Sequence, residues 1–135
     1  MHGGFRQPVP GHGDTLEPDE ICIAGDWLAS TPARTGDLGR RLRFVRAVET
    51  LDALCNATGI TPHDIRHVTE KHSGTRGIVQ LREVLSLVDA GAESPPETTT
   101  RLVLLDGRLP RPRTQVKVRD ATGHVVARCH MGWPR

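Results

Sequence analysis

Aromatic residues are scarce in this sequence of 135 residues: there are four, Phe5, Trp27, Phe44 and Trp133, and no tyrosine. A hydrophobic core must therefore be built from Leu, Val, Ile and Ala. No apolar run approaches the roughly 18 residues that a membrane helix needs, so no membrane association is expected. The three cysteines include no C-x-x-C pair and no signal peptide precedes them, which excludes a disulfide scaffold and indicates a cytoplasmic protein.

The first 20 residues also lack what a folded segment needs. They hold four Gly, three Pro and one aromatic ring, so residues 1–20 are predicted to be disordered. The segment "ICIA" (21–24) is a short candidate strand that ends at Gly25-Asp26.

Helical signals dominate the middle of the chain. Thr31-Pro32 and Thr61-Pro62 each place a capping hydroxyl before a proline suited to the first helical position. Apolar residues recur at helical spacing in 43–59, with Gly59 as the stop, and again in 75–91. Ser94 and Glu97 predict a capping box at the start of a further helix.

The pattern changes to alternation after residue 112. "TQVKVRDATGHVVARCHM" predicts two strands joined by a turn at 120–123. The predicted fold class is therefore α+β, with a helical N-terminal region followed by a helix and a β-hairpin. A lone hairpin is marginal in water, and its apolar edge at Val116, Val118 and Val126 predicts self-association.

Positive charge is clustered although the formal net charge is only +2. The stretches 34–46 and 101–119 each contain a single acid, and Arg suits phosphate because its planar fork donates two parallel hydrogen bonds. The alternative interpretation is a solvated surface. Seven side chains are candidates for binding DNA: Arg34, Arg40, Arg41, Arg101, Arg111, Arg113 and Lys117.

Three motifs carry a family resemblance over residues 31–135. "TPARTGDLGRRL", "ESPPETTTRLVLLDGRLPRPRTQVKV" and "MGWPR" occur in the order found in actinobacterial, including mycobacterial, proteins with the endonuclease-like domain DUF559. That domain is similar to the very-short-patch-repair endonucleases of the PD-(D/E)xK, restriction-endonuclease-like superfamily. "TPART" also resembles the region found in AbiEi-type antitoxin-like proteins. The resemblance divides the chain into 1–20, a helical region or linker at 21–90, and an endonuclease-like domain at 91–135.

What the resemblance implies is a Mg²⁺ site made by a Glu on a helix and by acids on the following strands. Glu97 matches the helix Glu, with Glu93 as a second candidate. His130 occupies the position of the strand Asp. A further strand with Glu-x-Asp-Gly is expected a few residues past Pro134, so the chain is expected to be a truncated relative.

Three functional interpretations follow from these residues. The first is a catalytically inactive relative of these endonucleases, because imidazole replaces a carboxylate; no cofactor is then expected, and Mg²⁺ only if activity remains. The second is a non-catalytic, antitoxin-like module that binds DNA. The third is a Mg²⁺-dependent DNA endonuclease completed by a partner chain. His63 and His67 are spaced to share a metal on one helix, but exposed helical histidines are the favoured interpretation.

Overall fold

The computed structural model describes residues 23–24, 27–28 and 32–135. Two short strands, β1 (Ile23–Ala24) and β2 (Trp27–Leu28), pair antiparallel with Ile23 opposite Leu28. The strand predicted at 21–24 is thus present in its second half, whereas the sequence pattern did not predict β2. The disorder predicted for 1–20 and the capping role of Thr31 lie outside the described residues.

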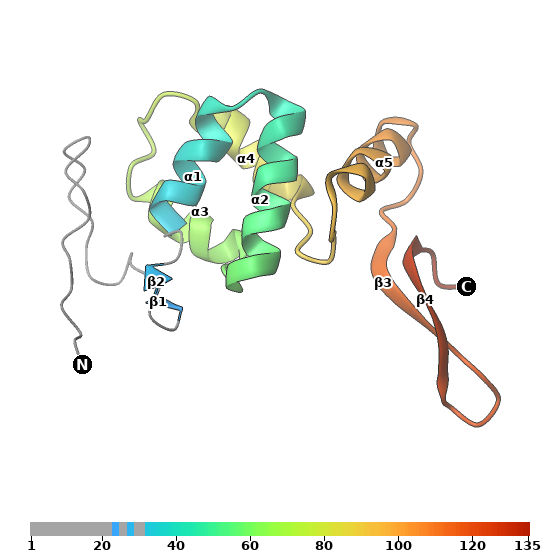
Figure 1. The fold of residues 1–135 in the computed structure, drawn as a ribbon. Helices are drawn as coiled ribbons and strands as arrows, with labels where there is room; N and C mark the ends of the chain where they lie inside the picture. The colour runs from blue at the N-terminus through green and yellow to red at the C-terminus, as the bar shows by residue number, and fades with distance from the viewer. Residues whose placement is uncertain (1–22, 25–26, 29–31) are drawn as a thin grey trace, which may run out of the picture.

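Four helices then pack around an aliphatic core (Figure 1). Their order along the chain is α1 (Pro32–Arg41), α2 (Phe44–Thr58), α3 (Pro62–Glu70) and α4 (Ile78–Leu87). The main buried cluster combines residues from α2, α3 and α4 and from the turns beside them: Ala47, Val48, Leu51, Cys55, Ile60, Ile65, Ile78, Leu81, Val84, Leu85 and Val88. This core contains no aromatic side chain that is fully buried, as the composition required.

The ends of α2 and α3 follow local signals in the sequence. Gly59 adopts the left-handed conformation with φ of 75°, and its N–H donates to the Cys55 carbonyl. Thr61 and Asp64 form a reciprocal capping box, in which each side chain accepts from the other residue's backbone N–H. The predicted helix boundaries at Gly59 and Thr61-Pro62 are therefore confirmed.

Helix α1 packs closely because it carries glycine on its inner face. A Cβ at Gly39 would lie 2.6 Å from Leu81 Cδ1, and one at Gly36 would lie 2.8 Å from Thr69 Cγ2. Both distances are shorter than carbon atoms tolerate, so α1 sits against α3 and α4 at a spacing that larger residues would prevent.

Helix α5 (Pro95–Asp106) is joined to α2 through polar side chains. Arg101 and Thr98 are 0% and 1% exposed, and both donate to Asp52 Oδ2, at 2.5 and 2.7 Å. The Arg101 guanidinium also donates to the Leu87 carbonyl at the end of α4. A buried ion pair therefore fixes the helix that carries Glu97.

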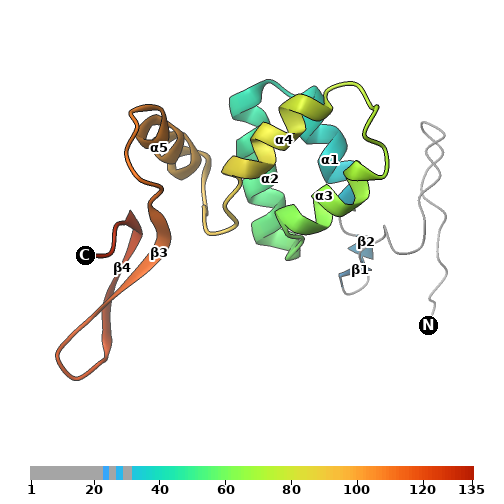
Figure 2. The same cartoon turned by 180° about the vertical axis from the view of Figure 1, so that it is seen from behind.

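The chain then forms an antiparallel hairpin of β3 (Arg113–Arg119) and β4 (Val125–Gly132), with Val116 opposite Cys129. The turn has a hydrogen bond from Gly123 N–H to the Asp120 carbonyl, and Gly123 has φ of 89°, a conformation that favours glycine. The predicted turn at 120–123 is confirmed. Figures 1 and 2 show the hairpin running away from the helices, with its turn at the far end.

Polar contacts attach the base of the hairpin to the loop after α4. Thr114 Oγ1 donates to Asp89 Oδ1 at 2.9 Å, and Gln115 Nε2 donates to the Gly91 carbonyl at 2.7 Å. A Cβ at Gly91 would lie 2.0 Å from Thr114 Oγ1, so this close approach requires glycine. The loop 89–91 therefore sets the position of β3, and with it that of β4.

These elements confirm the α+β class, with helices from residue 32 onward and a hairpin at 113–132. The division of the chain at residue 90 stays a prediction. Of the predicted apolar edge, Val118 and Val126 are 41% and 62% exposed, whereas Val116 is half-buried. Self-association through this edge stays a prediction. Within the described ranges, no helix is both long and apolar enough to cross a bilayer.

Candidate functional site

The first turn of α5 places Glu97 at the third helical position, where its carboxylate bends back toward the helix start. Glu97 Oε2 accepts from the Glu93 N–H at 3.1 Å, and Oε1 accepts from the Ser94 hydroxyl at 3.2 Å. The prediction that Ser94 and Glu97 form a capping box is wrong, because the Ser94 side chain accepts no backbone N–H. The Glu97 and Thr98 N–H groups bond to the Ser94 carbonyl, so the Ser94 hydroxyl donates to Glu97 instead of capping them.

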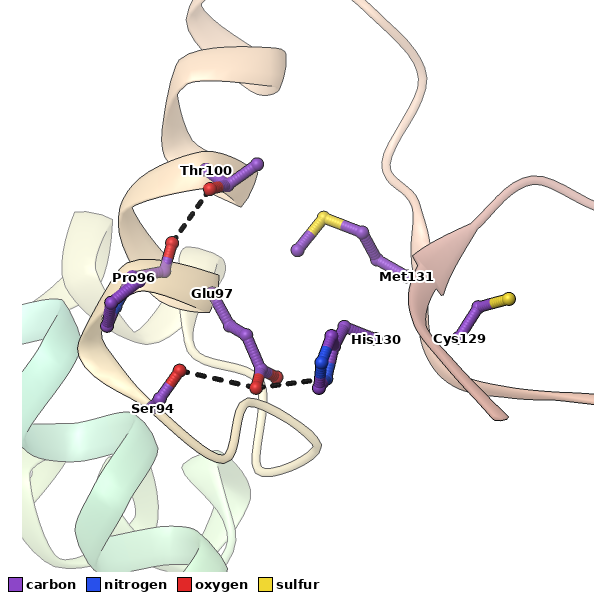
Figure 3. Close-up of a pocket in the computed structure, with 7 residues that line it drawn as sticks. All are labelled: Ser94, Pro96, Glu97, Thr100, Cys129, His130 and Met131. Carbon is purple, nitrogen blue, oxygen red and sulfur yellow. Dashed lines mark hydrogen bonds and ion pairs between the residues drawn. The ribbon is translucent and has the colours of Figure 1, made fainter. Parts of the chain in front are cut away.

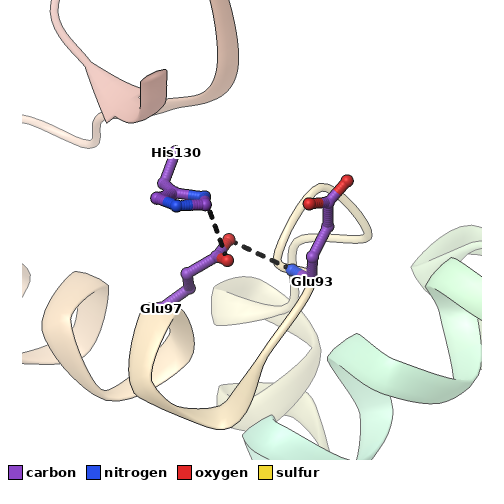
Figure 4. Close-up of side chains that lie close together, drawn as sticks. All are labelled: Glu93, Glu97 and His130. Atoms are coloured by element: carbon purple, nitrogen blue, oxygen red, sulfur yellow. Dashed lines mark hydrogen bonds and ion pairs between the residues drawn. The ribbon is translucent and has the colours of Figure 1, made fainter. Parts of the chain in front are cut away.

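Strand β4 places the His130 ring next to the Glu97 carboxylate (Figure 4). His130 Nδ1 lies 3.1 Å from Glu97 Oε1; the Glu97 side chain is 11% exposed and the His130 side chain 66%. With Glu93, these residues offer three ligand atoms that all lie within 4.8 Å of one another. The structure therefore brings together Glu97 and His130, the two positions that the resemblance singled out, and Glu93, the alternative candidate for the helix Glu.

The cluster opens into a shallow depression of about 590 Å³ between α5 and β4. Figure 3 shows Glu97, His130 and Met131 directed toward each other across it, whereas the Cys129 side chain points away from Glu97. This agrees with the alternation along a strand, which sends Cys129 and His130 to opposite faces. Cys129 therefore adds no ligand to the cluster.

One of the two carboxylates of the cluster is paired with a guanidinium. The Arg128 guanidinium donates to both carboxylate oxygens of Glu93, at 3.1 and 3.2 Å. Arg128 was not among the predicted residues; its position two residues before His130 on the same strand was the available signal. A cation entering the site would have to compete with Arg128 for Glu93.

Three of the predicted DNA-binding arginines make contacts within the fold, and Arg111 among them stays exposed. Arg101 is fully buried against Asp52, so its prediction as a DNA contact is wrong: no phosphate can reach it. Arg111 donates to the Ser86 and Val88 carbonyls at 2.6 and 2.9 Å. Arg40 is 13% exposed and is committed to the Asp37 carboxylate and the Arg76 carbonyl.

The other four predicted cations remain at the surface. Arg34 lies 3.9 Å from Asp37 Oδ2 and is 41% exposed. Arg41 at the end of α1 is exposed, as are Arg113 and Lys117 on β3. The exposed basic surface therefore divides between α1 and the hairpin.

Sequence reasoning missed the burial of Asp52, which lies on α2 between Leu51 and Ala53. Asp52 is 1% exposed and accepts from the Asp89 N–H at 2.7 Å as well as from Thr98 and Arg101. Burial raises the pKa of Asp52 above its ordinary value, and these hydrogen bonds act in the opposite direction. Its position on the apolar face of α2 was the one signal in the sequence.

The comparisons with known proteins place the chain beside mycobacterial sequences. It is 37% identical over 108 residues to two proteins of Mycobacterium tuberculosis, named Uncharacterized protein Rv2248 and Uncharacterized protein MT2308. The match covers 79% of this chain and 40% of each relative, so the chain spans about two-fifths of their length. No family model matches the chain. No solved structure matches it either.

Proposed function

We propose that the chain is an endonuclease-like module that keeps the position of a metal site but does not cleave DNA by itself. The observation that carries the proposal is the contact of 3.1 Å between His130 Nδ1 and Glu97 Oε1. It joins the helix and the strand on which the resemblance expects metal-binding acids, and one of those acids is replaced by imidazole.

The donor set explains the expected loss of cleavage. Mg²⁺ prefers oxygen ligands in octahedral geometry, and His130 supplies a nitrogen without negative charge. Glu93 is paired with Arg128, so Glu97 is the one acid of the cluster without a cationic guanidinium partner. In the mechanism that the resemblance implies, the metal both activates water and neutralises charge on the phosphate.

The same donor set suits a softer divalent ion such as Zn²⁺ or Mn²⁺. Two carboxylates and one imidazole can hold such an ion and leave a position for water. When bound, the metal would act as a Lewis acid at that open position. Glu97 and His130 would hold it, with Glu93 as the third ligand after release from Arg128.

Two other functions receive less support. An antitoxin-like module that binds DNA through residues 32–46 and strand 114–119 would use Arg34 and Arg40 on its helical side, and Asp37 accompanies both. A Mg²⁺-dependent endonuclease completed by a partner chain requires that the partner bring the missing acids. Both alternatives can be separated from the proposal by experiment.

The decisive test measures metal binding and DNA cleavage together. Isothermal titration with Zn²⁺, Mn²⁺ and Mg²⁺ should show binding of Zn²⁺ or Mn²⁺ that Glu97→Gln abolishes. His130→Asp should shift the preference toward Mg²⁺, whereas His124→Asp, on the hairpin turn, is the matched control and should leave binding unchanged. Plasmid nicking should stay at background with every metal.

Two outcomes contradict the proposal. Nicking by the unmodified chain that Glu97→Gln removes would identify a working nuclease. Failure of all three metals to bind at millimolar concentration would show that Glu97 and His130 form an ion pair and nothing more.

A further inference from the structure

Positive charge is concentrated in the last part of the chain. Residues 32–106 contain ten basic and ten acidic residues, so their formal net charge is zero. Residues 107–135 contain seven basic residues and one acid, a formal net charge of +6. This segment includes the hairpin, whose turn lies at the end far from the helices in both views (Figures 1 and 2).

The register of the hairpin separates cations from apolar side chains. Lys117 lies opposite Arg128, and Arg119, which follows a register shift after Val118, lies opposite Val125. The other face carries Val116 opposite Cys129, followed by the pair Val118 and Ala127. Lys117 and Arg128 therefore form a basic face opposite the Val116–Cys129 face, and Arg119 adds a further cation beside the turn.

The cations of this hairpin differ in how many of their N–H groups already donate to other residues of the chain. Arg128 is bidentate to Glu93 at the base. Lys117 is exposed, and exposed Arg119 donates one N–H to the Gly123 carbonyl, which leaves its other donors for a partner. Asp120, the one acid, accepts hydrogen bonds inside the turn from the Thr122 and His124 backbones. Lys117 and Arg119 are thus the cations best placed to meet an external anion.

We infer that the β3–β4 hairpin is a DNA-binding ribbon that enters the major groove of duplex DNA, with Lys117 and Arg119 on the phosphates. The major groove of B-form DNA, about 12 Å wide, admits a two-stranded β-ribbon. The deep, narrow major groove of A-form RNA does not admit side chains in this way. A second copy of the chain is a poorer partner, since it brings the same +6 to the contact.

This binding surface goes beyond the proposed function. It uses the outer hairpin and does not require the Glu97 cluster to hold a metal. Of the predicted surface, which joined residues 32–46 to strand 114–119, it keeps only the strand and adds the rest of the hairpin, because the helical part of the chain has no net charge. The two surfaces can therefore be compared directly in one assay.

The test is fluorescence anisotropy of a labelled 20-base-pair DNA duplex with the full chain, repeated over a salt series. The variant Lys117→Ala/Arg119→Ala should weaken binding about tenfold and lower the slope of log affinity against log salt by about 1.8. The matched control is Arg41→Ala/Arg46→Ala, which removes two exposed cations from the helical part. This control should stay within about twofold of the unmodified chain, since its cations lie outside the proposed interface.

A duplex RNA of the same sequence should bind more weakly than the DNA. The inference is overturned if the chain binds no DNA at low salt, or if both double variants lose the same affinity. Equal affinity for RNA and DNA would also overturn it, and so would sedimentation showing a dimer through the hairpin that excludes DNA. The affinity for DNA should be the same with and without EDTA, which separates this result from a failure of the proposed function.

Discussion

Replacing Arg101 by methionine should strongly destabilise the fold. Methionine has a similar length and is apolar, so the change removes the charge and the hydrogen bonds while keeping most of the packing. Asp52 would then remain 1% exposed, with only the Asp89 N–H and the Thr98 hydroxyl as donors. The Leu87 carbonyl would lose its guanidinium donor as well.

The size of the effect follows from the burial of both partners. Removing one member of a buried ion pair costs about 3–5 kcal/mol, because the other charge is left uncompensated. A domain of this size has a total stability of about 5–15 kcal/mol. At about 4 °C per kcal/mol, the expected decrease in Tm is about 12–20 °C.

The measurement is urea unfolding followed by circular dichroism at 222 nm. Arg82→Met is the matched control, because Arg82 also pairs with a carboxylate, that of Glu70, but at the surface, where the two side chains are 47% and 42% exposed. Exposed pairs contribute about 0–1 kcal/mol. The reasoning is refuted if Arg101→Met and Arg82→Met lose similar stability.

The pH dependence gives a second check on the same variant. Burial already raises the pKa of Asp52, and removing Arg101 raises it further. The Asp52 carboxyl of the folded variant then binds its proton more tightly than the same carboxyl does in the unfolded chain. Protonation of Asp52 therefore stabilises the folded variant at low pH, and this stabilisation is lost as the pH rises through the pKa of the folded state. Arg101→Met should therefore be less destabilising at pH 4.5 than at pH 7.

Two further predictions concern the helical core. The Thr61 backbone N–H bonded to Asp64 holds the pKa of that carboxyl below 3.8, so its contribution to stability is lost as pH falls. The difference in urea midpoint between the unmodified chain and Asp64→Ala should therefore shrink below that pH; an unchanged difference would contradict the capping box. Burial raises the pKa of Cys55 to about 11, whereas Cys129 is exposed. In a Cys22→Ser background, a thiol reagent should modify one cysteine in the native protein and two after unfolding.

Local sequence signals predicted most of the elements. Gly59 ends α2 and Thr61-Pro62 begins α3, because capping depends on residues only a few positions apart. The turn at Asp120–Gly123 likewise follows from its own residues. The sequence could not predict β2, whose two residues carry no periodic pattern.

The candidate site was predictable only as separate residues. The resemblance singled out Glu97 and His130, which are far apart in the chain, but their distance of 3.1 Å depends on how the hairpin attaches to the loop at Gly91. The role of Arg128 in neutralising Glu93 also follows from that attachment. Pairing across the fold is not encoded in local spacing.

What the sequence determined by itself is an aliphatic helical core, a hairpin and an excess of basic residues near the end. Only the tertiary structure decided which of those basic residues are available. In the sequence, Arg101 cannot be distinguished from an arginine at the surface. It is buried because Asp52 on another helix forms an ion pair with it, whereas Lys117 stays exposed. Burial of a charge depends on a partner brought from elsewhere in the chain, and the folded structure alone supplies that partner.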